Sequence, residues 1–143
     1  MDSQDPGPTG PGVLVVEDHA DLRQLLGVAL PQFGLPVWLA GGGREAVRLY
    51  REHRPEIGVV LLDVRMPDLD GPETLAALRE LDPAVRVVFM TGFSGPYSLE
   101  ELLALGARVV EKPFLGLEEL ARTLREVAQA QTPSPSGELR SQW

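Results

Sequence analysis

Short apolar runs and longer amphipathic segments alternate five times along the central part of this chain. The runs are rich in valine, and most are continuous instead of alternating with polar residues. Continuous apolar runs of this length are typical of strands that are buried on both faces of a sheet. We therefore predict five buried strands, at Val13–Val16, Val37–Ala40, Ile57–Leu62, Val85–Met90 and Val109–Val110.

The segments between these runs carry apolar residues at helical spacing. In the first of them, Leu22, Leu26, Ala29 and Phe33 fall on one face of a helix, and Pro31 is expected to end or kink that helix. The same spacing predicts four further helices, over residues 44–53, 72–81, 97–105 and 116–130.

Strand and helix repeated five times indicate a parallel sheet, because parallel strands need a crossover connection between them. Five such units are too few for an eight-stranded barrel. They fit a flavodoxin-like α/β fold, a doubly wound parallel sheet of strand order 2-1-3-4-5 between two layers of helices. In that architecture ligands bind beyond the carboxyl ends of the strands, where the winding direction reverses.

The two ends of the chain differ in composition from the middle. Residues 1–12 and 132–143 are rich in Pro, Gly and Ser and poor in aliphatic residues, so we expect flexible tails there and one domain over 13–131. Twelve residues after position 131 are too few for an output domain. The function is therefore expected to pass through a protein partner or through dimerisation.

Composition excludes several classes of function. The net charge of −8 argues against nucleic acid and anionic membranes as partners, and the absence of cysteine excludes disulfides and thiolate sites. No apolar run approaches the ~20 residues that span a bilayer, and no signal-peptide pattern opens the chain. We predict a cytoplasmic protein that binds neither nucleic acid nor membrane.

Polar residues that suit phosphate chemistry follow four of the five predicted strands. Glu17 and Asp18 follow the first strand, Asp63 the third, Thr91 the fourth and Lys112 the fifth. Three carboxylates at one edge of a sheet favour a hard divalent cation such as Mg²⁺. Lys112 is the only lysine among thirteen basic residues, which suggests a need for a compact point charge. A competing interpretation makes Asp18 a simple helix cap.

Four motifs in this order resemble the receiver domain of bacterial two-component response regulators. They are Val-Val-Glu-Asp at 15–18, Leu-Leu-Asp-Val-Arg-Met-Pro-Asp-Leu-Asp-Gly at 61–71, Met-Thr-Gly at 90–92 and Gly-Ala-Arg-Val-Val-Glu-Lys-Pro-Phe at 106–114. The resemblance covers essentially all of residues 13–131.

The resemblance implies a role for each residue at the strand ends. Asp63 would accept a phosphoryl group from the phosphohistidine of a histidine kinase or phosphotransfer protein. Asp18 and Asp63 would bind Mg²⁺ together with the backbone carbonyl of Arg65, and Glu17 would act through water. Lys112 would pair with a phosphoryl oxygen, and Thr91 would turn its hydroxyl onto the phosphoryl group.

The resemblance also implies a switch and not a turnover enzyme. Phosphorylation would reshape the face formed by the fourth helix, fifth strand and fifth helix, which would bind a downstream protein or a second copy of the chain. Val109 stands where the family usually has an aromatic residue, so either this aromatic gate is absent or another side chain, Phe93 or Tyr97, serves instead. The interval from Gly106 to Lys112 is one residue shorter than in many receivers, as in receivers of hybrid sensor kinases.

Three other interpretations remain open on the residues alone. A phosphatase of the haloacid-dehalogenase kind also uses an aspartate at a strand end, but it needs a second acid where this chain has Arg65. A pseudo-receiver would bind proteins without taking phosphate. The run Gly41–Gly43 before a helix is either a plain turn or a cradle for phosphate.

Overall fold

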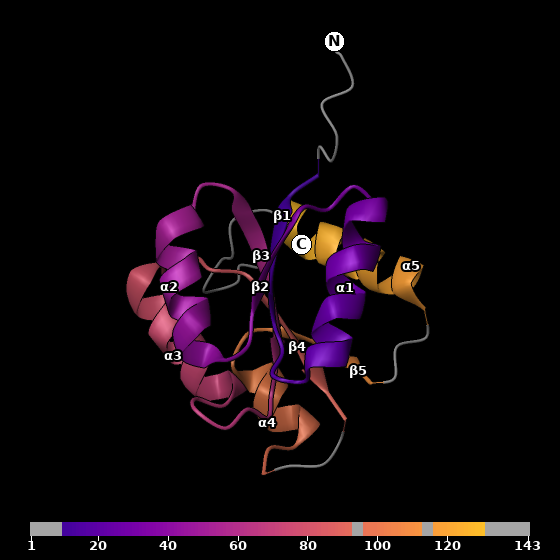
Figure 1. Ribbon diagram of the computed structural model, residues 1–143. Coiled ribbons are helices and arrows are strands. Elements are labelled where there is room, and N and C mark those ends of the chain that lie inside the picture. The colour runs from indigo at the N-terminus through magenta and orange to yellow at the C-terminus, as the bar shows by residue number, and fades with distance from the viewer. Residues whose placement is uncertain (1–9, 93–95, 113–115, 131–143) are drawn as a thin grey trace, which may run out of the picture.

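The computed structural model describes residues 10–92, 96–112 and 116–130, and these form a three-layer α/β sandwich (Figure 1). Five parallel strands make one sheet in the order β2-β1-β3-β4-β5, which confirms the predicted flavodoxin-like fold. The strands are β1 (Gly12–Val16), β2 (Val37–Ala40), β3 (Ile57–Asp63), β4 (Val87–Thr91) and β5 (Arg108–Glu111). The helices are α1 (Ala20–Gln32), α2 (Gly43–His53), α3 (Gly71–Leu81), α4 (Leu99–Ala104) and α5 (Leu117–Gln129).

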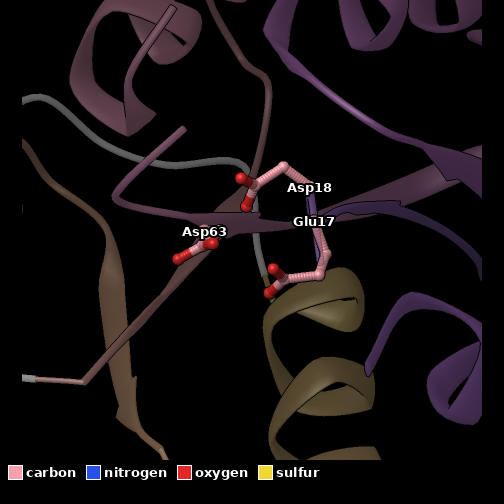
Figure 2. A group of neighbouring side chains, drawn as sticks. All are labelled: Glu17, Asp18 and Asp63. Carbon is pink, nitrogen blue, oxygen red and sulfur yellow. The ribbon is translucent and has the colours of Figure 1, made fainter. Parts of the chain in front are cut away.

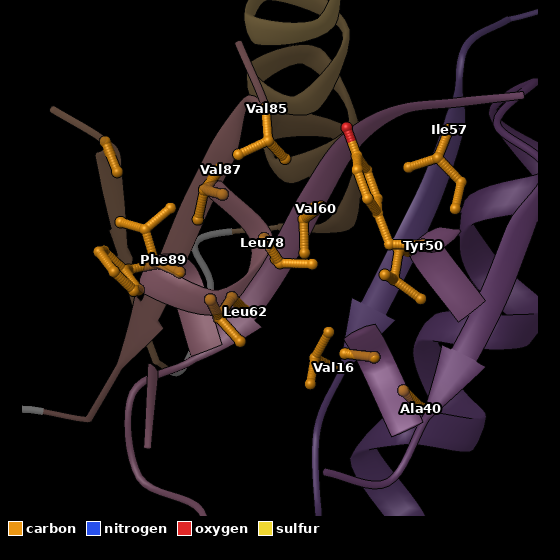
Figure 3. Packing of buried hydrophobic residues seen from close by; sticks show 14 of the residues in the cluster. Val16, Ala40, Tyr50, Ile57, Val60, Leu62, Leu78, Val85, Val87 and Phe89 are labelled. Atoms are coloured by element: carbon orange, nitrogen blue, oxygen red, sulfur yellow. The ribbon is translucent and has the colours of Figure 1, made fainter. Parts of the chain in front are cut away.

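Each face of the sheet has its own apolar core, because successive strand residues point to opposite faces. On one face, Val13 and Val15 of β1 pack among apolar residues of α1 and α5. On the other face, Leu14 and Val16 belong to a cluster that includes residues of α2, α3 and α4, with Tyr50 and Phe89 among its large side chains (Figure 3). Both faces are covered, which explains why the strands are continuously apolar.

Only β2 has the predicted bounds; β1 and β3 are each one residue longer than predicted, and β4 and β5 differ at both ends. The fourth strand begins at Val87, because the Val85 N–H donates to the Asp82 carbonyl oxygen (3.0 Å) in the turn that precedes it. The fifth strand extends over Arg108–Glu111, and its register pairs Thr91 with Glu111. The polar ends of this sheet-edge strand hid its length, so the predicted Val109–Val110 was too short.

The first helix passes through Pro31 and ends one residue later, at Gln32. Pro31 lies in the last turn, where its missing N–H removes only one hydrogen bond. Gly34 follows with φ +84, and it closes the helix end by donating its N–H to the Pro31 carbonyl oxygen (3.0 Å). The proline therefore marks the end of the helix, as predicted, within one residue.

The folded part already includes residues before the predicted start at 13. The Gly10 N–H donates to the Gly34 carbonyl oxygen (2.8 Å), and the Gly12 N–H donates to the Glu56 carbonyl oxygen (3.2 Å). Within the described ranges, no helix is long and apolar enough to cross a membrane.

Candidate phosphoryl-acceptor site

One cleft at the carboxyl end of the sheet holds every site residue that the sequence predicts. The cleft has a volume of about 540 Å³. It lies where β1 and β3 are neighbours and the order of winding reverses. Its predicted members are Glu17, Asp18, Asp63, Arg65, Thr91 and Lys112, and His19 stands at its rim.

Three carboxylates in this cleft lie close enough to share one cation. Glu17, Asp18 and Asp63 each offer an oxygen within 4.8 Å of the others (Figure 2). Glu17 is 1% exposed and Asp63 is 6% exposed, whereas Asp18 is open to solvent. The group therefore combines two buried acids with one at the mouth of the cleft.

Lys112 bridges the two buried acids. Its Nζ lies 2.9 Å from Glu17 Oε1 and 3.3 Å from Asp63 Oδ1. The Lys112 N–H also donates to the Thr91 carbonyl oxygen (2.8 Å), which fixes the start of this side chain beside the end of β4. The flexible lysine stem reaches both carboxylates with one compact charge.

Burial, hydrogen bonds and neighbouring charges shift the pKa values of the two buried acids in opposite directions. Burial, and then the charge of Glu17, raise the pKa of Asp63 to about 6, although Lys112 opposes them. Burial also opposes the ionisation of Glu17, but hydrogen bonds from the His19 N–H and from Lys112 outweigh it and lower the pKa of Glu17. Without a cation, Asp63 is therefore the group that keeps a proton more readily.

The donor set fits Mg²⁺. Its atoms are carboxylate oxygens, which a hard divalent ion prefers, and one acid faces solvent, where metal-bound waters find room. The competing role of Asp18 as a helix cap is wrong, because the N-cap of α1 is His19, and the N–H of His19 donates to Glu17 Oε2 (2.9 Å).

Asp68 is a structural residue that the sequence did not reveal. Its Oδ1 accepts from the Gly43 N–H (3.1 Å) and its Oδ2 from the Arg44 N–H (3.0 Å), so it caps α2 from the loop after β3. One interpretation of Gly41–Gly43 was a cradle for phosphate. In the structure the Asp68 carboxylate binds the N–H groups at this helix start, where the phosphate would have been bound. The glycines therefore form a turn that admits Asp68, because a Cβ at Gly42 would lie 2.9 Å from Asp68 Oδ1.

Three residues considered for the switch, Val109, Phe93 and Tyr97, lie apart from this cleft or outside the described ranges. Val109 lies half-buried on β5 and packs against the core beside α4. Phe93, one of the two aromatic replacements considered above, lies outside the described residues, and so does Pro113. Tyr97, the other replacement, is placed before α4, and its hydroxyl donates to Asp70 Oδ2 (2.7 Å).

Comparison with known proteins identifies a family. The family model of the response regulator receiver domain matches residues 13–125. Over 121 residues, the chain is 33% identical to the regulatory protein AtoC of Escherichia coli, covering 84% of this chain and 26% of AtoC. It is 34% identical over 120 residues to the sensor kinase CckA of Brucella abortus, covering 83% of this chain and 13% of CckA.

A solved structure agrees with the family model. The chemotaxis protein CheY4 of Vibrio cholerae superposes with a TM-score of 0.74 at 31% identity, covering 83% of this chain and 99% of that one. The likeness thus extends over a complete receiver, but over only a minor part of the longer relatives. By sequence, fold and site, this chain belongs to the receiver-domain family of two-component response regulators.

Proposed function

We propose that Asp63 is the phosphoryl acceptor of this receiver and that the chain works as a signalling switch. The observation that carries this proposal is the placement of Asp63 at the end of β3. There its buried carboxylate lies between Lys112 and two further acids. A nucleophilic carboxylate with a cation beside it suits phosphoryl transfer, which depends mainly on positioning and charge neutralisation.

The proposed transfer is a substitution at phosphorus. An oxygen of ionised Asp63 attacks the phosphorus of a phosphohistidine, an O–P bond forms, and the N–P bond of the imidazole breaks. Lys112, which lies 3.3 Å from Asp63 Oδ1, would hold a phosphoryl oxygen, and Thr91, buried at the end of β4, would donate its hydroxyl to another. Asp18, Asp63, the Arg65 carbonyl and, through water, Glu17 would hold Mg²⁺, which neutralises charge on the transferred group.

The family suggests the phosphoryl donor, and an exposed apolar surface suggests where a downstream partner would bind. The donor would be a histidine kinase or a phosphotransfer protein. The output surface would be the α4-β5-α5 face, where Leu99 and Leu103 of α4 are 46% and 49% exposed. Because the matched region makes up nearly all of the CheY4 chain but only part of AtoC and CckA, the same switch would serve as a stand-alone module or as one domain of a longer protein.

The test is direct. Acetyl phosphate and Mg²⁺ should add one phosphoryl group to the protein, measured as intact mass. A chelator added before the donor should prevent the addition. A pseudo-receiver would show no addition either from this donor or from a phosphorylated phosphotransfer protein. A phosphatase would instead turn over a phosphate ester in many cycles.

Mg²⁺ should stabilise the protein more at pH 7.5 than at pH 5.0. The pKa of Asp63 is raised to about 6, so the metal-free native state binds a proton that the unfolded state has already lost. The free energy of unfolding of the metal-free protein therefore falls as the pH rises toward 6. Mg²⁺ must displace the Asp63 proton only below about pH 6, where this carboxyl is mostly protonated. At pH 5.0 the ion should bind about tenfold more weakly. Thermal unfolding with and without Mg²⁺ measures the difference, and equal shifts at both pH values would contradict it.

The phosphorylated form should survive well beyond seconds. Arg65 lines the cleft two residues after Asp63, and its bulk would screen the acyl phosphate from an attacking water. Phe93 is the second residue expected to contribute, from outside the described ranges. Decay of the phosphorylated mass after donor removal measures the lifetime, and Arg65→Ala should shorten it several-fold. A wild-type lifetime of a few seconds would refute this screening.

A further inference from the structure

Both tyrosines of the chain donate a hydrogen bond to an aspartate, and these aspartates cap opposite ends of α3. Tyr97 Oη donates to Asp70 Oδ2 (2.7 Å), and Asp70 is the N-cap of α3. Tyr50 Oη donates to Asp82 Oδ2 (2.6 Å), and Asp82 is the C-cap. Tyr50 belongs to α2, whereas Tyr97 immediately precedes the N-cap of α4. The Tyr97 bond therefore ties α3 to α4 at the end of the molecule that carries the acid cleft.

The atoms at both ends of the Tyr97 bond are held by their own helices. Asp70 Oδ1 accepts from the Glu73 N–H (2.9 Å), while Glu73 Oε1 accepts from the Asp70 N–H (2.9 Å). Ser98, which follows Tyr97, forms the same reciprocal pair with Glu101 at the start of α4. The bond thus joins two capped helix starts, and a displacement of one must either move the other or break the bond.

The hydroxyl of Tyr97 remains a donor at any physiological pH. Its hydrogen bond to the Asp70 carboxylate raises the pKa of Tyr97 to about 12. Its ring packs against the core cluster on the α2–α4 face of the sheet, which includes Phe89 and Leu102. Leu102 is the buried side chain of α4, a helix of six residues. Arg79 of α3 also donates to the carbonyl oxygen of Leu105, the C-cap of α4 (2.5 Å), so the Tyr97 bond is the link to α3 at the start of this helix.

The start of α3, which Asp70 caps, packs against the backbone of Asp63, although seven positions separate the two aspartates in the chain. The Gly71 N–H donates to the Val64 carbonyl oxygen (2.8 Å), which closes the loop of residues 64–70 into a tight turn. A Cβ at Gly71 would lie 2.9 Å from the Asp63 carbonyl oxygen and 2.9 Å from Val64 Cα. The start of α3 therefore rests directly on the backbone of the acceptor residue, with no side chain between them to absorb a shift.

We propose that Tyr97 is a positioning residue whose hydroxyl links loop 64–70 to the start of α4. Through this link, phosphorylation of Asp63 changes the position of α4. The exposed surface that it orients includes Leu99 and Leu103. The link itself is a property of the unphosphorylated protein. The transmission step rests on the proposed function, because it requires Asp63 to take the phosphoryl group.

The chain offers a matched pair of variants for the test. Tyr97→Phe and Tyr50→Phe each remove one phenolic oxygen that bonds an aspartate at an end of α3, and each leaves the ring in the core. Hydrogen–deuterium exchange with mass spectrometry follows residues 99–104 in both variants and in the wild type. Each protein is measured alone and again with Mg²⁺ and acetyl phosphate, and intact mass reports phosphoryl uptake in the same samples.

The link predicts a distinct result in each half of the experiment. Without donor, α4 amides should exchange about three- to tenfold faster in Tyr97→Phe than in the wild type, while Tyr50→Phe leaves them unchanged. With donor, all three proteins should take up a phosphoryl group. The change in α4 exchange rate that phosphorylation causes should be several-fold smaller in Tyr97→Phe than in the wild type and in Tyr50→Phe.

Three outcomes would count against the proposal, and they are distinguishable. Unchanged α4 exchange in unphosphorylated Tyr97→Phe would overturn the link. Normal uptake with a full α4 response in this variant would overturn the transmission. Absence of uptake in all three proteins would overturn the transmission together with the proposed function, while the donor-free comparison would still decide on the link.

Discussion

Replacing Asp63 with asparagine should abolish phosphoryl uptake while the fold remains intact. An amide cannot form the acyl phosphate, and the remaining acid with an accessible carboxylate, Asp18, lies at the mouth of the cleft. The variant should also be more stable than the wild type at pH 7.5 without Mg²⁺, by about 1–2 kcal/mol. The reason is that Asp63, whose pKa is raised to about 6, must ionise there beside the buried charge of Glu17. The loss of uptake could then not be attributed to misfolding.

Intact mass after treatment with acetyl phosphate and Mg²⁺ measures the uptake, and urea denaturation measures the stability. Asp68→Asn is the matched control, because Asp68 stands on the same loop but bonds the start of α2. It should retain phosphoryl uptake. If Asp63→Asn took up phosphoryl as the wild type does, the acceptor would be a different residue and the assignment would be wrong.

Replacing Lys112 with methionine should give a large loss of stability at pH 7.5 without Mg²⁺. Methionine keeps much of the length of the side chain, but it leaves Glu17 and Asp63 buried without their shared cation. Breaking a buried pair costs about 3–5 kcal/mol, and because a quarter of the Lys112 side chain is exposed we expect about 2–4 kcal/mol. Urea denaturation of both proteins measures this difference.

The pH dependence of that loss has a definite sign. In the wild type the pKa of Glu17 is lowered, partly through Lys112, so this group favours the native state at neutral pH. Without Lys112 its pKa rises, and the variant regains stability as acid protonates the buried pair. The gap should therefore narrow toward pH 5 and also when Mg²⁺ replaces the lost charge. Arg122→Met, which breaks an exposed pair with Glu119, should cost less than about 0.5 kcal/mol.

The order of strands and helices was predictable because burial on both faces leaves a strong local pattern. The residue types of Ile57–Leu62 alone predict a strand, which the structure extends by one residue to Asp63. The polar residues that follow the apolar runs mark where the cleft forms. Strand bounds failed where this pattern weakened. Arg108 and Glu111 belong to the strand at the sheet edge through their pairing with β4, which their own residue types do not reveal.

The residues that the sequence did not reveal act through contacts between distant segments. Asp68 bonds Gly43 across 25 positions and Tyr97 bonds Asp70 across 27, and neither pair follows a helical or strand period. A carboxylate in a loop has the same local appearance whether it caps a helix, binds a cation or faces water. Such pairs become visible only when the fold brings the two segments together.

The contact of Asp68 with the start of α2 restricts which substitutions this part of the protein can accept. A Cβ at Gly43 would lie 2.2 Å from Thr74 Oγ1 and 2.7 Å from Leu69 Cβ, so the turn before α2 and the start of α3 fill one shared space. Libraries that vary residues 41–43 and 68–74 separately would mostly sample clashes, whereas paired variation could find compatible solutions. Length changes in either segment face the same limit, because each segment fills space that the other also borders.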